Sequence, residues 1–149
     1  MALNFNKFAA EGNHFIKETA KHLGYPDDTE RTGRVVVSIL HALRNHLSPE
    51  ESVQLIAQLP MSLKAVYVIN WKLHEKKKKV RHFEDFIDEI RAIHGTVAVR
   101  DFPKDDDVET AISVVFMMLR KYLSLGELED IKALLPKEIK SILNSALML

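Results

Sequence analysis

Two pairs of residues in this chain have the types and spacing of metal ligands. Glu11 and His14 form a Glu-x-x-His motif, which in di-iron helical bundles directs two ligands from one helix into the interior. When the two halves of the sequence are aligned, His82 and Asp85 fall at the matching places. These four residues are a candidate metal site between the halves, although the further Glu ligands of a full di-iron centre cannot be identified. Because Glu11 and His14 lie largely off the predicted buried face of their helix, the default interpretation is that they are two solvent-facing polar residues.

A second candidate is a run of basic residues between the two halves. The candidate interaction residues of this region are Trp71, Lys76, Lys77, Lys78, Lys79 and Arg81. Such a run attracts phosphates or anionic lipids when it forms a patch, and otherwise it is a solvated linker. Trp71 is the only tryptophan, and it is either an anchor that packs between the halves or a hot spot for a partner.

Other chemistry finds little support in the sequence. There is no Gly-rich phosphate loop and no nucleophile elbow. The absence of cysteine excludes disulfides, thiolate metal sites and a cysteine nucleophile. The acidic residues from Asp101 to Glu109 lack the pattern of a calcium loop, so we interpret them as helix caps. No catalytic residue and no cofactor is predicted, and a non-catalytic role is favoured over an enzyme.

Composition narrows the class of protein further. The chain has 149 residues, with 21 Lys and Arg against 21 Asp and Glu, so its formal net charge is zero. Dedicated nucleic-acid binders usually carry a basic surplus, and this balance argues against that class. The longest apolar runs are far shorter than the about 20 residues that cross a bilayer. The N-terminus lacks the apolar run of a signal peptide, so we expect a cytoplasmic protein without a transmembrane segment.

The elements that must position these residues recur along the chain. The stretch "LRNHLSPEESVQLIAQLP" starts at Leu43, and the similar stretch "LRKYLSLGELEDIKALLP" starts at Leu119. Each contains a serine followed three residues later by a glutamate, which predicts a capping box at the start of a helix. Each ends in a proline that breaks the helix. The shared caps and breaks indicate an internal duplication.

A longer helix is predicted before each capping box, because apolar residues recur there at helical spacing. The predicted buried positions are Val36, Ile39, Leu40, Leu43 and Leu47 in the first copy, and Val108, Ala111, Ile112, Val115, Phe116, Leu119 and Leu123 in the second. His41 and His46 fall off this stripe.

Glycines and prolines mark the remaining helix ends. Gly24 and Gly95 are predicted C-caps, and the short run 96–102 is predicted to be a loop. The expected fold is all-α, with two tandem four-helix repeats and about eight helices. The first repeat covers residues 1–70, a basic linker residues 71–81, and the second repeat residues 82–149. The pattern is compatible with one shared core as well as with two.

Taken together, these stretches resemble a known family. "ALRNHLSPEESVQLIAQLP", "YLSLGELEDIKALLPKEIKSIL", "FNKFAAEGNHF" and "LGYPDDTERTGRVV" are similar to the bacterial family called domain of unknown function 2267. The resemblance covers nearly the whole chain. It implies a soluble, helical, internally duplicated bacterial protein, and it brings no established catalytic residues.

The function that these observations favour is a non-catalytic protein-interaction or self-association module. The lack of a catalytic constellation supports it, and so does the apolar C-terminal "SALML", which is expected to dock on the bundle or on another subunit. A protein partner or a second copy is therefore expected, and nucleic acid is not. The alternative is a helical bundle that binds a ligand or metal between the repeats, either as a binder or as an enzyme.

Overall fold

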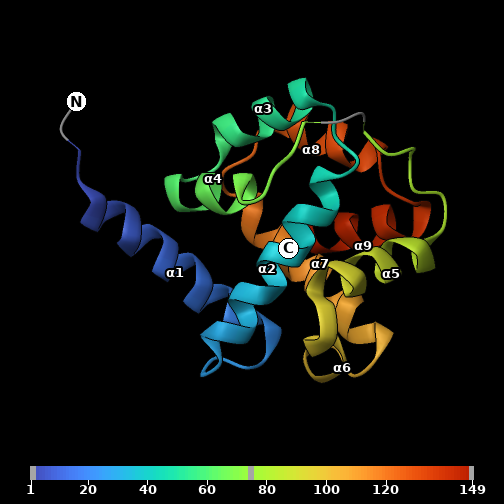
Figure 1. Cartoon of the computed structure of the whole chain (residues 1–149), viewed down its shortest axis with the longest axis horizontal. Helices are drawn as coiled ribbons and strands as arrows, with labels where there is room; N and C mark the ends of the chain where they lie inside the picture. Colours follow the sequence, from blue (N-terminus) through green and yellow to red (C-terminus); the bar gives the residue numbers. More distant parts are fainter. Residues whose placement is uncertain (1–2, 74–75, 148–149) are drawn as a thin grey trace.

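The computed structural model describes residues 3–73 and 76–147, and every regular element in these two ranges is helical (Figure 1). In chain order the helices are α1 (Phe5–Leu23), α2 (Thr29–Arg44), α3 (Pro49–Gln58), α4 (Met61–Val68), α5 (Phe83–His94), the 3₁₀ turn η1 (Gly95–Val97), α6 (Ala98–Asp101), α7 (Asp105–Leu119), α8 (Leu125–Ala133) and α9 (Lys137–Leu147). The predicted all-α fold class is confirmed.

The two long helices α2 and α7 lie at the centre of the molecule. Every residue predicted for their buried stripes is buried, as are Leu47 and Leu123 just beyond the helices. α2 packs against α5, and α7 packs against α9, while α1 contacts both α2 and α7. Helices from before and after the basic linker therefore contribute to one continuous hydrophobic cluster. The internal duplication and the repeat boundaries stay predictions.

The two predicted capping boxes differ in the structure. At the start of α3 the Ser48 hydroxyl accepts from the Glu51 amide, and the Glu51 carboxylate accepts from the Ser48 amide at 2.8 Å, so the box is complete. At the start of α8 only the Ser124 hydroxyl bond forms. The Ser124 amide donates instead to Gln58 at the end of α3, at 2.7 Å. The second box is thus half formed, and its freed amide ties α8 to α3.

One sequence expectation for local structure is wrong. Residues 96–102 are not a loop, because η1 and α6 continue the chain after α5 as two short helical turns. This tight path carries Asp101 and Phe102 into the core, where each is 1% exposed. His41 and His46, which fall off the predicted stripe, are also buried, and their rings have partners in the carbonyls and a carboxylate of neighbouring elements.

The glycines at the two predicted helix ends behave as expected in part. Gly24 ends α1 in the left-handed conformation with φ of 92°. Gly95 ends α5 with φ of 82°, but its ψ of −153° lies outside the left-handed helical region. A third glycine, Gly12, serves close packing of α1 on α4, because an added Cβ would lie 2.7 Å from the Ser62 Cβ and Oγ atoms. No helix in residues 3–73 and 76–147 is long and apolar enough to cross a membrane.

Candidate functional site

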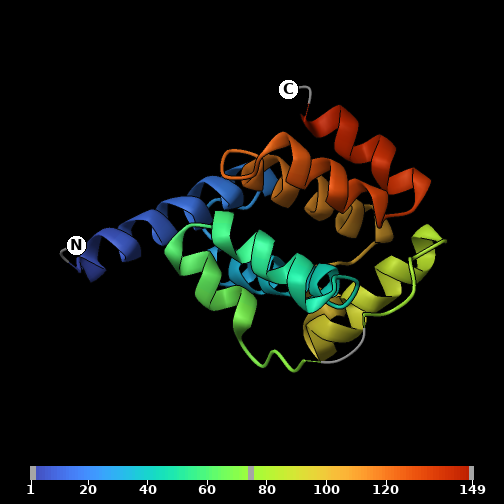
Figure 2. The ribbon, with the colours of Figure 1, turned by 90° about the horizontal axis from the view of Figure 1, so that it is seen from above.

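The structure does not bring the four predicted metal ligands together. Glu11 and His14 are exposed on the N-terminal half of α1, which projects from one side of the molecule. His82 and Asp85 lie at the start of α5, on the opposite side in both views (Figures 1 and 2). Across the described residues, no cluster of three or more His, Asp or Glu side chains has the geometry to hold a metal ion.

The basic segment, residues 76–82, is attached to the body of the protein rather than freely solvated. It runs along the edge of the molecule to the start of α5 (Figure 1). The Lys77 amide donates to the Asn45 carbonyl at 2.9 Å, just after the end of α2. Val80 is 8% exposed and joins the hydrophobic cluster. These contacts give the segment a defined path across α2 and α5.

His46 fastens the middle of the basic segment. Its Nδ1 lies 3.1 Å from the carbonyl oxygen of Lys78, and its Nε2 lies 2.7 Å from a carboxylate oxygen of Glu89 on α5. His46 is 5% exposed, so its ring is enclosed between a peptide group of the basic segment and a carboxylate of α5.

Glu89 is the acidic partner that supports this arrangement. Burial opposes its ionisation, but hydrogen bonds from His46 and Lys77 outweigh burial and lower the pKa of Glu89. Lys77 Nζ lies 2.8 Å from the second carboxylate oxygen. In the same way Lys76 pairs with Glu51 of α3 at 3.1 Å. Two of the predicted interaction lysines are thus already engaged within the chain.

The other three predicted cations, Lys78, Lys79 and Arg81, are exposed and have no ion-pair partner within the described ranges. They line an open groove of about 740 Å³ together with the residues that fasten the segment. The remaining lining residues are His46, Lys77, Val80, His82, Asp85 and Glu89. The groove brings residues from before and after the linker together, and half of the predicted metal set, His82 and Asp85, belongs to it.

Trp71 lies before the basic segment, at an exposed apolar edge. Its ring contacts the Tyr67 ring edge-on, with centroids 6.1 Å apart, and it is half-buried. Three apolar neighbours are more exposed: Val68 at 42%, Ile69 at 48% and Leu73 at 73%. Arg44, at the end of α2, holds this turn by donating to the carbonyls of Tyr67 and Ile69. The apolar edge and the basic segment therefore flank the same end of α2.

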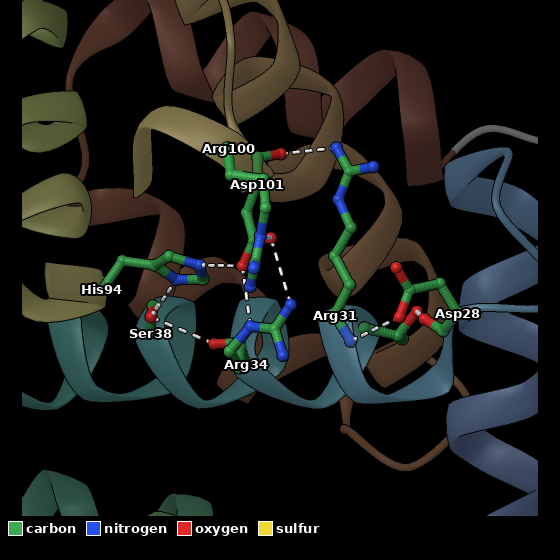
Figure 3. Close-up of polar contacts among 8 residues, drawn as sticks. Asp28, Arg31, Arg34, Ser38, His94, Arg100 and Asp101 are labelled. Atoms are coloured by element: carbon green, nitrogen blue, oxygen red, sulfur yellow. Dashed lines mark hydrogen bonds and ion pairs between the residues drawn. The ribbon is translucent and has the colours of Figure 1, made fainter. Parts of the chain in front are cut away.

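A Ser–His–Asp arrangement that the sequence did not reveal lies between α2, α5 and α6 (Figure 3). The Ser38 hydroxyl is 2.7 Å from His94 Nδ1, and His94 Nε2 is 2.6 Å from the Asp101 carboxylate. Ser38 also bonds to the Arg34 carbonyl on its own helix. A nucleophile must be reachable by its substrate, yet Ser38 is 3% exposed and the side chains of His94 and Asp101 are 0% and 1% exposed. The arrangement is therefore structural.

Asp101 is the centre of this polar cluster. Arg34 of α2 binds its carboxylate with Nε at 2.8 Å and Nη2 at 3.1 Å, a bidentate pair. Arg31, one turn earlier on α2, donates to the Asp101 carbonyl (Figure 3). The Arg34 bonds hold the pKa of Asp101 well below its usual range, with burial opposing and His94 adding to the effect. The interpretation of Asp101 as a helix cap is wrong, because its carboxylate instead ties α6 to α2 and α5.

Part of the predicted C-terminal interaction tail lies outside the described residues. Met148 and Leu149 are not described, and α9 is described to Leu147 without the side chains of residues 145–147.

Comparison with known protein families identifies the chain over most of its length. A sequence model of the family described as "Uncharacterized conserved protein (DUF2267)" matches residues 12–142. No curated protein matches the chain. The matched range includes the end of α2, the apolar edge, the basic segment and the buried Asp101 cluster.

Proposed function

This chain belongs to the DUF2267 family of uncharacterised conserved proteins, and we propose that it is a non-catalytic module that binds an acidic segment of another protein. The proposed binding surface, here called the linker face, consists of Val68, Ile69, Trp71 and Leu73 together with Lys78, Lys79 and Arg81. The observation that carries the proposal is an exposed apolar edge beside three cations that have no ion-pair partner among residues 3–73 and 76–147, at one end of α2.

The apolar part of the linker face supplies the area that a partner can bury. Leu73 is 73% exposed, and Trp71 is fixed against Tyr67 while part of its ring stays open. Binding to a side chain that is already held in place costs little conformational entropy. Tryptophan is also enriched among the residues that dominate binding energies. Both features favour Trp71 as the anchor of the surface.

The basic part of the linker face indicates the charge of the partner. Lys78, Lys79 and Arg81 project from a segment whose path is fixed by His46 and Val80. Cations on a fixed segment attract an acidic partner and set its orientation, and they repel a basic one. Because the formal net charge of the whole chain is zero, the attraction of an acidic partner comes from the linker face and not from the overall charge of the protein.

The proposed absence of catalysis rests on the sealed Ser38–His94–Asp101 cluster. It is the arrangement in the described chain that most resembles catalytic machinery, and its hydroxyl is enclosed by α2 and α5. The Asp101 carboxylate that binds His94 also binds Arg34 in a bidentate pair, so it ties α6 to α2. Its residues therefore support a structural role rather than a chemical one.

The test is affinity capture from a lysate of the natural host with two matched variants. The linker-face variant combines W71S and L73S with K78E, and its control, on other exposed positions, combines L125S and V99S with K121E. We expect the protein that the wild type captures repeatedly to be lost with the linker-face variant and retained with the control variant. We also expect the segment of that protein that cross-links to the linker face to be acidic. A partner set that both variants share would overturn the proposal.

Self-association is the other outcome that this experiment separates. Sedimentation of the purified protein reports whether it forms dimers without any partner. An oligomer that the linker-face variant dissociates, with no captured protein, would reassign the surface to a second copy of the chain. It would overturn the proposed acidic partner.

A further inference from the structure

The groove beside the linker face carries a concentrated positive charge. Its lining contains four cationic side chains, those of Lys77, Lys78, Lys79 and Arg81, against two carboxylates. In a chain whose net charge is zero, this local surplus stands out. An open concave surface lined by one sign of charge raises the local concentration of the opposite ion.

The negative charges of the groove are partly neutralised from within. Glu89 is paired with both His46 and Lys77, at 2.7 and 2.8 Å. Asp85 is the remaining carboxylate, exposed at the rim. Lys78, Lys79 and Arg81, which have no partner in the described ranges, are therefore available to a ligand.

The start of α5 opens toward the same groove. His82 is the N-cap residue of this twelve-residue helix, and no side chain caps its first amides. Free amides at a helix start favour anions, although Glu84 and Asp85 in the first turn offset part of this preference. The helix start adds to the cations and is not needed to explain the charge of the groove.

We propose that this groove is a binding site for a doubly charged phosphoryl group, borne by a small molecule or by a phosphorylated side chain. Where the group belongs to a protein, the inference rests on the proposed function and names the acidic feature of the partner. A dianion gains more than a single carboxylate from three cations that line one groove. Arg81 can bind two of its oxygens with the planar guanidinium, while the lysines act as point charges.

Nucleic acid fits the groove less well. A duplex presents a long row of phosphates and requires a basic face of matching length, whereas the cations here are confined to one short segment. Single strands also need aromatic platforms for the bases. The groove lining contains no aromatic side chain other than the rings of His46 and His82, and Trp71 is not part of it.

The first experiment titrates the full chain with sodium phosphate and with sodium sulfate at constant ionic strength, and follows backbone amides by NMR. Sulfate remains a dianion across the working range, so it separates ligand charge from phosphate titration. The groove variant is K78Q/K79Q/R81Q, and the matched control is K17Q/K121Q/K137Q. We expect saturable shifts at residues 78–85 with both anions, at least tenfold weaker binding in the groove variant, and unchanged binding in the control.

A second arm distinguishes the two sources of the phosphoryl group. A short neutral peptide with one phosphoserine is compared with its unphosphorylated form and with inorganic phosphate. If the phosphopeptide binds at least tenfold more tightly than phosphate, and L73S removes this difference in affinity, the phosphoryl group belongs to a protein segment that also contacts the apolar edge. Equal binding of phosphate and phosphopeptide assigns it to a small molecule.

The inference is overturned if neither anion produces saturable shifts, or if the control triple variant weakens binding as much as the groove variant. Its failure is separable from that of the proposed function. A protein partner that depends on Trp71 and Leu73, while phosphate and phosphopeptide leave residues 78–85 unshifted, would support the proposed function and remove the phosphoryl site.

Discussion

Replacing Asp101 with asparagine tests whether the buried polar cluster stabilises the fold. Asparagine keeps the shape of the side chain, but it removes the charge and points an N–H group at donors of Arg34 or His94. Breaking a buried ion pair by changing one partner costs about 3–5 kcal/mol. The Arg34 side chain is 34% exposed. Its guanidinium therefore keeps part of its hydration in the variant, and the cost falls at the lower end of this energy range. We expect D101N to lower the free energy of unfolding by about 3 kcal/mol at pH 7.

The pH dependence of this loss provides an independent check. The pKa of Asp101 is lowered by Arg34 in the folded state, while an unfolded Asp has a pKa of about 3.9. The stabilisation is therefore complete above the unfolded pKa and is lost as the pH falls toward the folded one. Between pH 7 and pH 3 the gap between wild type and D101N should narrow by about 1 kcal/mol, because the wild type alone loses this contribution.

Urea unfolding followed by circular dichroism at both pH values measures these differences. The matched control is D105N, because Asp105 also pairs with an arginine, Arg91 at 2.9 Å, but is 70% exposed. The free energy of unfolding of D105N should lie within about 1 kcal/mol of the wild-type value. The reasoning is refuted if D101N costs less than about 1 kcal/mol at pH 7, or if its deficit is the same at pH 3.

Three further predictions have signs that the structure determines. G12A should lower the free energy of unfolding in urea by about 1–2 kcal/mol, because the added Cβ would lie 2.7 Å from Ser62 of α4. G33A, whose added Cβ has open space on α2, should raise it by about 0.5–1 kcal/mol. Equal effects of the two substitutions would contradict the packing argument. Y67F should lower the free energy of unfolding by about 1–2 kcal/mol, because the buried Ser52 hydroxyl loses its 2.7 Å hydrogen bond to the Tyr67 hydroxyl. In a double-mutant cycle, S52A should destabilise the Y67F variant less than it destabilises the wild type. E127Q should raise the melting temperature at pH 7 but not at pH 4. Burial, together with nearby Asp130 and Glu51, raises the pKa of Glu127, so its ionised form destabilises the fold at pH 7. An equal gain in melting temperature at both pH values would count against this cause.

Periodic features of the sequence predicted the fold well. The buried stripes of α2 and α7 follow directly from apolar residues at helical spacing. The capping serines of α3 and α8 and the terminal glycines of α1 and α5 mark real helix ends. These features depend on neighbours within a few positions of the chain. The half-formed second capping box shows the limit, because the Ser124 amide finds Gln58, which is distant in the sequence.

The candidate site could be predicted only in part. The basic run was visible as composition, but its attachment through His46 and Glu89 depends on α2 and α5 packing together. The Asp101 cluster joins residues 34, 38, 94 and 101 from three elements, and no local spacing connects them. A lone aspartate in a run of acids has the same sequence signal whether it caps a helix or binds a buried arginine.

The packing of α2 has a consequence for synthesis of the protein on the ribosome. Part of the buried face of α2 is covered by α5 and α7, which follow it by tens of residues in the chain. At translation rates of about 5–20 residues per second, that face waits for several seconds or more after it emerges. During this interval an apolar helix surface is open to solvent and to other nascent chains. We expect the emerging first half to be a substrate for chaperones, and expression of residues 1–70 alone to yield aggregate.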